Sequence, residues 1–260
     1  MRIGVAGLDG RVGRLLAASV AATNGLEFVG GTVRRGIDPS ASRFGSIAAL
    51  AAGCDVVIDF TAAAAVAEHA ARLADSGVRW VLGTTGLDAA GEAALRRAAG
   101  TIPVLRAANF APGVVLMVEL ARRMAAALPA DRFDAEIHEM HHRDKRDAPS
   151  GTALAIGRAV AEGRGHDLDA VRDEARRGQC GPRRPGAIGF AVSRGGHVVG
   201  EHALSFTAND EQISLAHRAF DRAVFAEGAL LGARWLGAPE RPPGLYGMED
   251  VLGLRSAAPG

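Results

Sequence analysis

Lys145 is the only lysine in this 260-residue chain, because 29 of the 30 Lys and Arg residues are arginines. A guanidinium stays charged at any accessible pH, whereas an ammonium can give up its proton when its surroundings change its pKa. Lys145 also follows the pair His141-His142 closely in the sequence. These residue types at this spacing indicate proton transfer, with the lysine as proton donor. A solvated loop lysine is the plainer alternative.

The segment His138-Glu139-Met140-His141-His142 also matches His-Glu-x-x-His, the motif of zinc proteases. That motif needs a helix, so that both histidines share one face. Residues 133–141 carry no apolar stripe of helical period, and they lead into the charged loop around Asp147-Ala148-Pro149. They are therefore predicted to form a strand, and no metal is expected. Stoichiometric zinc, with loss of activity on chelation, would reverse this interpretation.

Ser150-Gly151-Thr152 precedes a helix predicted over 153–162. Ser150 could act only as the N-cap of that helix. Alternatively, backbone N–H groups at Gly151 and Thr152 could receive a substrate carboxylate at the helix N-terminus. Five basic residues lie close by in the sequence, so the pocket is predicted to suit a small polyanionic molecule: His141, His142, Arg143, Lys145 and Arg146.

A glycine-rich turn, Gly7-Leu8-Asp9-Gly10-Arg11-Val12-Gly13, follows the first predicted strand and opens the first predicted helix. Glycines there let the backbone approach a pyrophosphate, and the helix N-terminus offers N–H groups and a positive dipole end. The spacing differs from the commoner Gly-x-Gly-x-x-Gly, and such turns also occur for packing. Its position between strand and helix predicts a dinucleotide site.

The first part of the chain alternates short apolar strands with amphipathic helices. Strands separated by helices of this length imply parallel crossovers, and hence an α/β, Rossmann-type, doubly wound parallel sheet. The strands are predicted at 3–6, 26–33, 54–60, 79–82 and 103–107, and the helices at 11–22, 46–52, 63–76 and 89–100.

After residue 111 the pattern changes to a smaller α+β domain with a mixed sheet. Helices are expected at 114–128 and 153–162, an exposed loop at 172–186, and strands at 133–141, 187–193, 198–207 and 211–219. The strands 187–193 and 198–207 should be antiparallel and joined at Gly195-Gly196. A helix at 220–236 should return to the first domain, and the tail from 239 should be irregular. The expected divisions are 1–111, 112–219 and 220–260.

Composition argues against several classes of protein. The net charge is +1, and no basic block is interleaved with aromatics, so nucleic acid is not an expected partner. Two cysteines are too few for a disulfide framework. The alanine-rich stretch 62–71 contains Glu68 and His69, and the first residues do not form a signal peptide, so no membrane association is expected. The chain is predicted to be cytoplasmic.

Several motifs occur together and in order along the chain. They are Gly7-x-x-Gly10-Arg11-x-Gly13, Asp59-Phe60-Thr61, Gly83-Thr84-Thr85-Gly86, Asn109-Phe110, Glu139-x-His141-His142-x-x-Lys145-x-Asp147-Ala148-Pro149-Ser150-Gly151-Thr152-Ala153-Leu154 and Arg194-x-Gly196-x-x-x-Gly200-Glu201-His202. With these motifs the chain resembles the 4-hydroxy-tetrahydrodipicolinate reductases (dihydrodipicolinate reductases) of bacterial lysine and diaminopimelate synthesis. The resemblance extends through the tail 244–254.

The resemblance implies a hydride transfer from a nicotinamide to a small cyclic dicarboxylate, whose hydroxyl is lost as water. It implies that His141 is the acid/base residue and Lys145 the proton donor, and that the substrate carboxylates are bound by His142, Gly151 and Thr152. It also implies a homotetramer built through the sheet of the second domain. The cofactor would be bound by Gly7, Leu8, Asp9, Gly10, Arg11, Val12, Arg34, Gly83, Thr84, Thr85, Ala107, Ala108, Asn109 and Phe110.

Two other functions are considered. One is a related NAD(P)-dependent amino-acid or imine dehydrogenase, which a substrate panel would distinguish. The intact His-His/Lys and Ser-Gly-Thr segments argue against it. The other is a non-catalytic regulator that senses NADP, which would bind NADPH tightly without turnover. Such a protein has no reason to keep one lysine beside two histidines.

The cofactor is predicted to be NADPH, with NADH as the second possibility. The second strand ends at Val33-Arg34-Arg35, where NAD sites usually place Asp or Glu, and arginine suits a 2′-phosphate. The catalytic efficiency with NADPH should exceed that with NADH in the wild type, and Arg34→Glu should reduce the ratio. A wild type that favours NADH would contradict this prediction.

Overall fold

The computed structural model describes residues 1–33, 42–174 and 176–255. The chain divides into two compact units, one made of Met1–Pro112 with Ala223–Gly260 and the other of Gly113–Arg222. Among the described residues, no helix is long and apolar enough to cross a membrane.

The first unit is built on a seven-stranded sheet whose strand pairs are all parallel. Six strands follow the order β3-β2-β1-β4-β5-β6, which is the doubly wound order of dinucleotide-binding sheets. The predicted Rossmann-type sheet is therefore confirmed. Its strands are β1 (Arg2–Ala6), β2 (Glu27–Thr32), β3 (Arg43–Phe44), β4 (Val56–Asp59), β5 (Arg79–Leu82), β6 (Pro103–Arg106) and β12 (Gly244–Tyr246).

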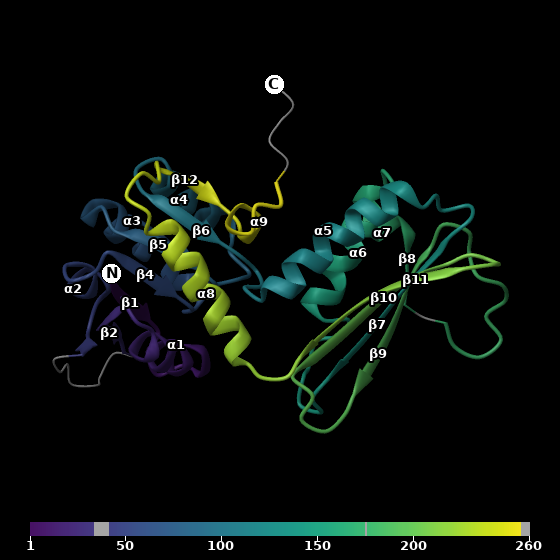
Figure 1. The fold of residues 1–260 in the computed structure, drawn as a ribbon, viewed down its shortest axis with the longest axis horizontal. Coiled ribbons are helices and arrows are strands. Elements are labelled where there is room, and N and C mark those ends of the chain that lie inside the picture. Colours follow the sequence, from purple (N-terminus) through teal and green to yellow (C-terminus); the bar gives the residue numbers. More distant parts are fainter. Residues whose placement is uncertain (34–41, 175, 256–260) are drawn as a thin grey trace. The chain divides into compact units, whose positions relative to one another are not determined.

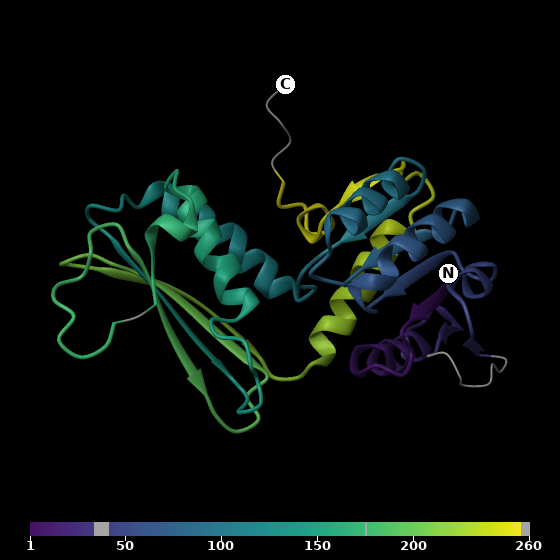
Figure 2. The same cartoon turned by 180° about the vertical axis from the view of Figure 1, so that it is seen from behind.

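Helices cover both faces of this sheet, as Figures 1 and 2 show from opposite sides. β4 is buried along its whole length, as expected for a strand with helices on both faces. The helix α8, which follows the second unit in the sequence, packs against β4, β5 and β6 and so returns to this unit. The helical elements are α1 (Arg11–Ala22), α2 (Ile47–Ala51), the 3₁₀ turn η1 (Ala63–Ala65), α3 (Val66–Ser76), α4 (Ala89–Ala99), α8 (Ala223–Leu236) and α9 (Met248–Val251).

The tail was predicted to be irregular, and this prediction was wrong. β12 joins the edge of the sheet, where Leu245 pairs with Val104 of β6, and α9 follows. Tyr246 packs edge-on against Trp235, at 5.2 Å between ring centroids. A three-residue strand is too short to show an alternating pattern, so only its tertiary pairing reveals it.

The second unit contains a five-stranded mixed sheet in the order β11-β10-β7-β9-β8. β10 is antiparallel to β7 and β11, whereas β9 is parallel to β7 and β8. This confirms the predicted α+β unit with a mixed sheet. Its elements are α5 (Pro112–Ala127), β7 (Asp134–His141), α6 (Gly151–Gly163), α7 (Leu168–Val171), β8 (Arg172–Asp173), β9 (Ile188–Arg194), β10 (Gly200–Thr207) and β11 (Gln212–Ala219).

β9 and β10 are antiparallel, but they are not neighbours, because β7 lies between them. The sequence suggested a direct connection at Gly195-Gly196, yet that connection crosses the end of β7. There Gly195 N–H donates to the carbonyl of His141. β7 lies between β9 and β10 because its apolar residues pair with apolar residues of both strands, as Ile137 does with Leu204 and with Phe190.

One face of this sheet packs against α5 and α6, and its residues change in character along the strands. Ile137, Leu204 and Phe206 are fully buried in the apolar core under the helices. Farther along β7 and β10, the residues on the same face are Glu139 and His202, which pair with each other in the strand register. This polar half of a buried face is the framework of the site described next.

Candidate active site

The alternation of β7 decides which of its polar side chains can act together. Glu139 and His141 are buried, whereas His138 is exposed on the other face. The two histidines of the His-Glu-x-x-His motif are His138 and His142, and residues four apart on a strand lie about 13 Å from each other, because each residue advances the strand by about 3.3 Å. Because Asp134–His141 form a strand and not a helix, His138 and His142 are not brought together as the motif requires, and the predicted strand is confirmed.

The Glu139 carboxylate is surrounded by hydrogen-bond donors. Its Oε1 accepts from the backbone N–H of Ser150 and from Arg194 Nη2, both at 3.0 Å, and its Oε2 contacts His141 Nδ1. Burial raises the pKa of Glu139, but the hydrogen bonds from Arg194, Ser150 and His141 outweigh burial and hold the pKa below its ordinary value. Glu139 is therefore ionised at neutral pH.

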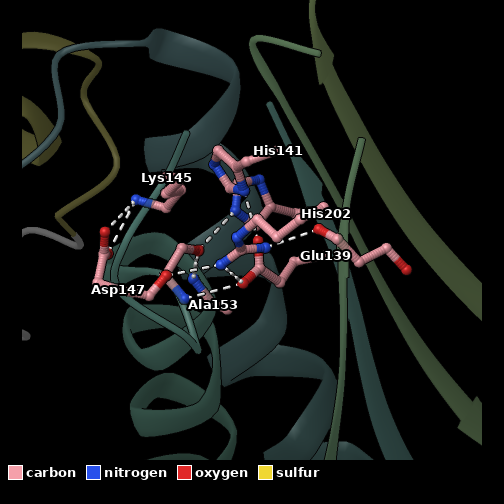
Figure 3. Close-up of polar contacts among 9 residues, drawn as sticks. Glu139, His141, Lys145, Asp147, Ala153 and His202 are labelled. Atoms are coloured by element: carbon pink, nitrogen blue, oxygen red, sulfur yellow. Dashed lines mark hydrogen bonds and ion pairs between the residues drawn. The ribbon is translucent and has the colours of Figure 1, made fainter. Parts of the chain in front are cut away.

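His141 is neutral under the same conditions. Burial lowers its pKa below the ordinary value of 6.5, although Glu139 opposes this effect. Its ring lies edge-on to that of His202, with 5.1 Å between the centroids. Figure 3 shows both histidines beside Glu139.

Ser150 joins this cluster to the start of α6. Its hydroxyl accepts from the N–H of Ala153 at 3.1 Å, which confirms Ser150 as the N-cap, and it also bonds His202 Nε2 at 3.1 Å. Gly151, at the first position of α6, is exposed, and Thr152 is half-buried. The predicted carboxylate-binding turn therefore begins one residue from a serine held by Glu139 and His202.

Lys145 lies in the loop between β7 and α6. Its Nζ bonds both carboxylate oxygens of Asp147, at 2.9 and 2.8 Å, and its side chain is only 20% exposed. The hydrogen bond from Lys145 is the main reason that the pKa of Asp147 lies below its ordinary value. Arg194 Nη2 bonds the carbonyl of Asp147 at 2.7 Å, which fixes the loop to β9. Figure 3 shows this pair next to Glu139 and His141.

Four residues of this cluster were named only as parts of motifs, without a role: Glu139, Asp147, Arg194 and His202. The alternation in β7 was the available signal, because it places Glu139 on the same face as His141. Arg194 and His202 lie 55 and 52 residues from their partners in the sequence, so no local pattern reveals them.

Glu139, His141 and His202 also lie within 4.8 Å of one another by their ligand atoms, close enough to hold a metal ion. Both carboxylate oxygens already accept hydrogen bonds, and the Arg194 guanidinium lies on one of them. A metal ion would have to compete with the permanent positive charge of Arg194 for the Glu139 carboxylate. Hydrogen bonding is therefore sufficient to explain why these three side chains lie together. The prediction that no metal takes part therefore stands as a prediction.

The glycine turn after β1 has the geometry that dinucleotide binding needs. Gly7 has a φ of 85°, in the left-handed region, and a Cβ on Gly13 would lie 2.2 Å from the Gly7 carbonyl oxygen. Gly10 caps α1 without any side-chain hydrogen bond. The N-terminus of α1 therefore presents its backbone to a ligand, and these residues fit a pyrophosphate.

A cavity of about 850 Å³ opens at this turn. It is lined by three of the predicted cofactor residues (Gly7, Asp9 and Gly10) and also by Phe60, Thr61 and His69. Leu8, Arg11 and Val12 belong to the same turn but do not line the cavity. Asp9 bonds Arg43 at 2.8 Å, which offsets its negative charge. Arg34 lies outside the described residues, although the cavity reaches Thr32 and Val33 at the end of β2.

The other predicted cofactor segments follow the neighbouring strands β5 and β6. Thr84, after β5, bonds the Thr61 carbonyl at 3.0 Å, and Gly83 lies so close to Phe60 that a Cβ would meet its ring at 2.3 Å. Phe110 packs against the Phe60 ring, at 5.4 Å between centroids. The predicted cofactor residues after β5 and β6 therefore follow the ends of these strands, at the same edge of the sheet where β4 ends. They are Gly83, Thr84, Thr85, Ala107, Ala108, Asn109 and Phe110.

A buried carboxylate fixes the wall of the cavity. Asp59 is fully buried at the end of β4, and it accepts from both the N–H and the hydroxyl of Thr61, at 3.0 and 2.6 Å. Its other oxygen contacts His69 Nδ1 at 2.7 Å and accepts from Trp80 Nε1 at 3.3 Å. Asp59 thus holds the turn of Phe60 and Thr61 in place, a role that the Asp-Phe-Thr motif did not reveal.

One unit of this chain has a doubly wound sheet with a glycine-lined cavity. The other unit carries a site made of histidine, lysine and a helix N-terminus. Together they define a two-unit NAD(P)-dependent oxidoreductase. The family descriptions "Dihydrodipicolinate reductase, N-terminus" and "Dihydrodipicolinate reductase, C-terminus" match residues 1–110 and 113–252. The chain belongs to the dihydrodipicolinate reductase family.

Relatives and solved structures agree with this assignment. A 4-hydroxy-tetrahydrodipicolinate reductase of Gluconacetobacter diazotrophicus is 59% identical over 254 residues, and one of Acidiphilium cryptum is 57% identical; both alignments cover 98% of each chain. The dipicolinate-bound dihydrodipicolinate reductase from Paenisporosarcina sp. TG-14 is 25% identical, with a TM-score of 0.79 over 96% of this chain and 98% of that one. A DAP dehydrogenase of C. glutamicum, 16% identical with a TM-score of 0.56 over 98% and 96%, shares the fold alone.

His202 should make the protein less stable in acid. Burial, and then the nearby His141, lower the pKa of His202 from 6.5 to about 4. As the pH falls below 6.5 the unfolded chain binds a proton that the folded chain takes up only near pH 4, so the free energy of unfolding falls over this window. The difference amounts to about 3 kcal/mol, since one tenfold step in proton affinity is about 1.4 kcal/mol.

Urea unfolding between pH 7.5 and 4 measures this effect. His202→Gln should remove about 3 kcal/mol of the pH dependence, whereas His166→Gln, on the exposed surface, serves as the control and should retain it. Parallel curves for the wild type and His202→Gln would contradict the prediction.

Proposed function

We propose that this chain reduces 4-hydroxy-tetrahydrodipicolinate to tetrahydrodipicolinate with loss of water, in diaminopimelate and lysine biosynthesis, with NADPH as the preferred reductant. The observation that carries the proposal is the arrangement around β7. A neutral His141 is held by an ionised Glu139, near the loop of Lys145 and the N-terminus of α6.

The binding groups suit a small dicarboxylate. The start of α6 supplies backbone N–H donors and a positive dipole end for one carboxylate, at Gly151 and Thr152. His142 and Lys145, in the preceding loop, are the proposed partners of substrate carboxylates and protons. In support, the relative from Paenisporosarcina is described as dipicolinate-bound, and dipicolinate is a dicarboxylate.

His141 and Lys145 are proposed to move protons. His141 is neutral at pH 7, so one of its ring nitrogens can accept a proton and return it. Lys145 carries a transferable proton and lies against the carboxylate of Asp147, which is 61% exposed. A substrate carboxylate carries the same charge as Asp147 and can take its place beside the ammonium, which brings the donor to the substrate.

The cofactor would supply the hydride. Gly7, Asp9 and Gly10 are proposed to hold its pyrophosphate at the N-terminus of α1, and Phe60 and Thr61 to form a further part of the cavity wall. The segments 83–85 and 107–110 are proposed to line the rest of the cofactor, since they follow the neighbouring strand ends. The preference for NADPH rests on Arg34, and a cytoplasmic location stays a prediction from the sequence.

We also propose a homotetramer built through the five-stranded sheet. Figure 1 shows α5, α6 and α7 on one side of this sheet, and within the described residues no helix covers the other side. A hollow of this sheet is lined by Ala191, Ala203 and Ala216 together with larger side chains such as His138 and Arg218. Light scattering of the purified chain should give four times the 26.8 kDa of the monomer. A monomer mass would contradict the proposal.

Lys145→Arg tests the proposed chemistry. Purified enzyme should oxidise NADPH when supplied with freshly generated 4-hydroxy-tetrahydrodipicolinate, which is unstable. Arginine keeps the charge but not a transferable proton, so Lys145→Arg should lose about 10²–10⁴-fold in kcat, the usual contribution of general acid catalysis, while folding and NADPH binding persist.

The matched control is Arg158→Lys, the opposite exchange at an exposed position of α6. It should turn over substrate like the wild type. If Lys145→Arg were equally active, the proposed role of Lys145 would be wrong. A wild type that binds NADPH tightly but fails to reduce the substrate would instead favour the sensing regulator.

A further inference from the structure

Glu139 has only one way to interact with His141. The carboxylate is 99% buried, with a side-chain exposure of 1%, and it is ionised, so both of its oxygens can only accept hydrogen bonds. Oε1 already accepts from Ser150 N–H and Arg194. The ring atom that contacts Oε2 is Nδ1 of His141, and this atom must therefore be the donor. A neutral ring protonated at Nδ1 carries its lone pair on Nε2.

We infer that Glu139 is the positioning residue of this enzyme, holding His141 in the Nδ1–H tautomer so that Nε2 is the atom that exchanges a proton with the substrate. The inference rests on the proposed function, because it assigns the working atom of the residue proposed as acid/base. No role for Glu139 in proton transfer is needed, since its carboxylate orients the ring that exchanges the proton.

Gly200 supports this assignment from the neighbouring strand. A Cβ on Gly200 would lie 3.0 Å from His141 Nε2, tighter than ordinary contact, so the glycine leaves room beside this atom. Gly200 is not among the glycines with positive φ, so its backbone conformation would accept alanine. Residue 200 is a glycine because a side chain at this position would fill the space beside His141 Nε2.

Glu139 also couples the two halves of the proposed substrate site. The same oxygen that accepts from Arg194 accepts from the N–H of Ser150, which caps α6. One carboxylate therefore fixes both the acid/base ring and the helix N-terminus proposed to hold a substrate carboxylate. Among the described residues, the charged and titratable groups that act on His141 come from β7, the β7–α6 loop, β9 and β10: Glu139, Lys145, Arg194 and His202.

Glu139→Gln tests the inference. A glutamine offers one acceptor oxygen to three donors, and its own N–H groups face a donor, so His141 loses its fixed partner. We expect kcat to fall about 10²-fold, the lower end of acid–base contributions, with NADPH affinity unchanged. Glu139 raises the pKa of His141, so the His141 limb of the pH–rate profile should move to lower pH in the variant. A purely structural role would lower activity without moving this limb.

Nitrogen-15 NMR of histidine-labelled enzyme gives a readout that does not depend on turnover. The His141 signals, assigned by comparison with His141→Asn, should show the Nδ1–H tautomer in the wild type and a mixture in Glu139→Gln. Gly200→Ala should keep the Nδ1–H tautomer but lose activity, because its Cβ crowds Nε2. Glu162→Gln, whose exposed carboxylate pairs with Arg122 on the helices, is the matched control and should behave like the wild type.

The outcomes separate this inference from the proposed function. A wild type without reductase activity would refute the proposed function, and the spectrum would then still show whether Glu139 holds His141 in the Nδ1–H tautomer. An active wild type whose His141 carries its proton on Nε2, or a Glu139→Gln variant with wild-type kcat and pH profile, would overturn the inference. If the Glu139→Gln variant is destabilised, the inference is decided by the His141 tautomer in the wild-type spectrum and by the activity and tautomer of Gly200→Ala.

Discussion

The buried carboxylate of Glu139 is the interaction on which the second unit depends most. An ionised group in an apolar interior costs several kcal/mol unless it is paired and hydrogen-bonded. Glu139 meets that cost with donors from three separate elements: the Ser150 N–H at α6, the Arg194 guanidinium on β9 and the ring of His141 on β7. Because the loss of one donor would leave the charge only partly compensated, these elements must keep their relative positions. The rigidity that the proposed acid–base chemistry needs is therefore a consequence of burying a charge.

The two units use the N-terminus of a helix in contrasting ways. In the first unit, the N-cap of α1 is Gly10, which supplies no side-chain hydrogen bond, so the helix end remains open to a phosphate. In the second, the N-cap of α6 is Ser150, whose hydroxyl caps the helix while His202 and Glu139 hold the serine. An uncapped end suits a large and strongly charged ligand, whereas a capped and anchored end suits a small carboxylate that must be placed accurately. Asp59 in the first unit parallels Glu139, since each is a buried carboxylate that fixes a turn next to a proposed ligand.

The site also depends on how one sheet face divides along its strands. Ile137 and Leu204 bury the apolar half under α5 and α6, and two residues farther along the strands the same face carries Glu139 and His202. Side chains two residues apart on a strand point to the same face of the sheet. The packing that orients the apolar half of this face therefore also orients its polar half. A slip of one residue in the register of β7 would bury His138 and expose Glu139 and His141. The apolar core therefore specifies the geometry of the chemistry.

Local patterns were sufficient for much of this protein. The alternation of strands and helices predicted the parallel sheet, and the glycine turn and the isolated lysine with two histidines pointed to the candidate cofactor edge and the candidate site, because each signal lies within a few neighbouring residues. Sequence alone did not reveal that β7 separates β9 from β10, that β12 extends the first sheet, or that Arg194 and His202 complete the cluster around Glu139. These features are contacts between residues far apart in the chain. Strand order and register, which follow from burying the most apolar surface, decide such contacts, and no local spacing records them.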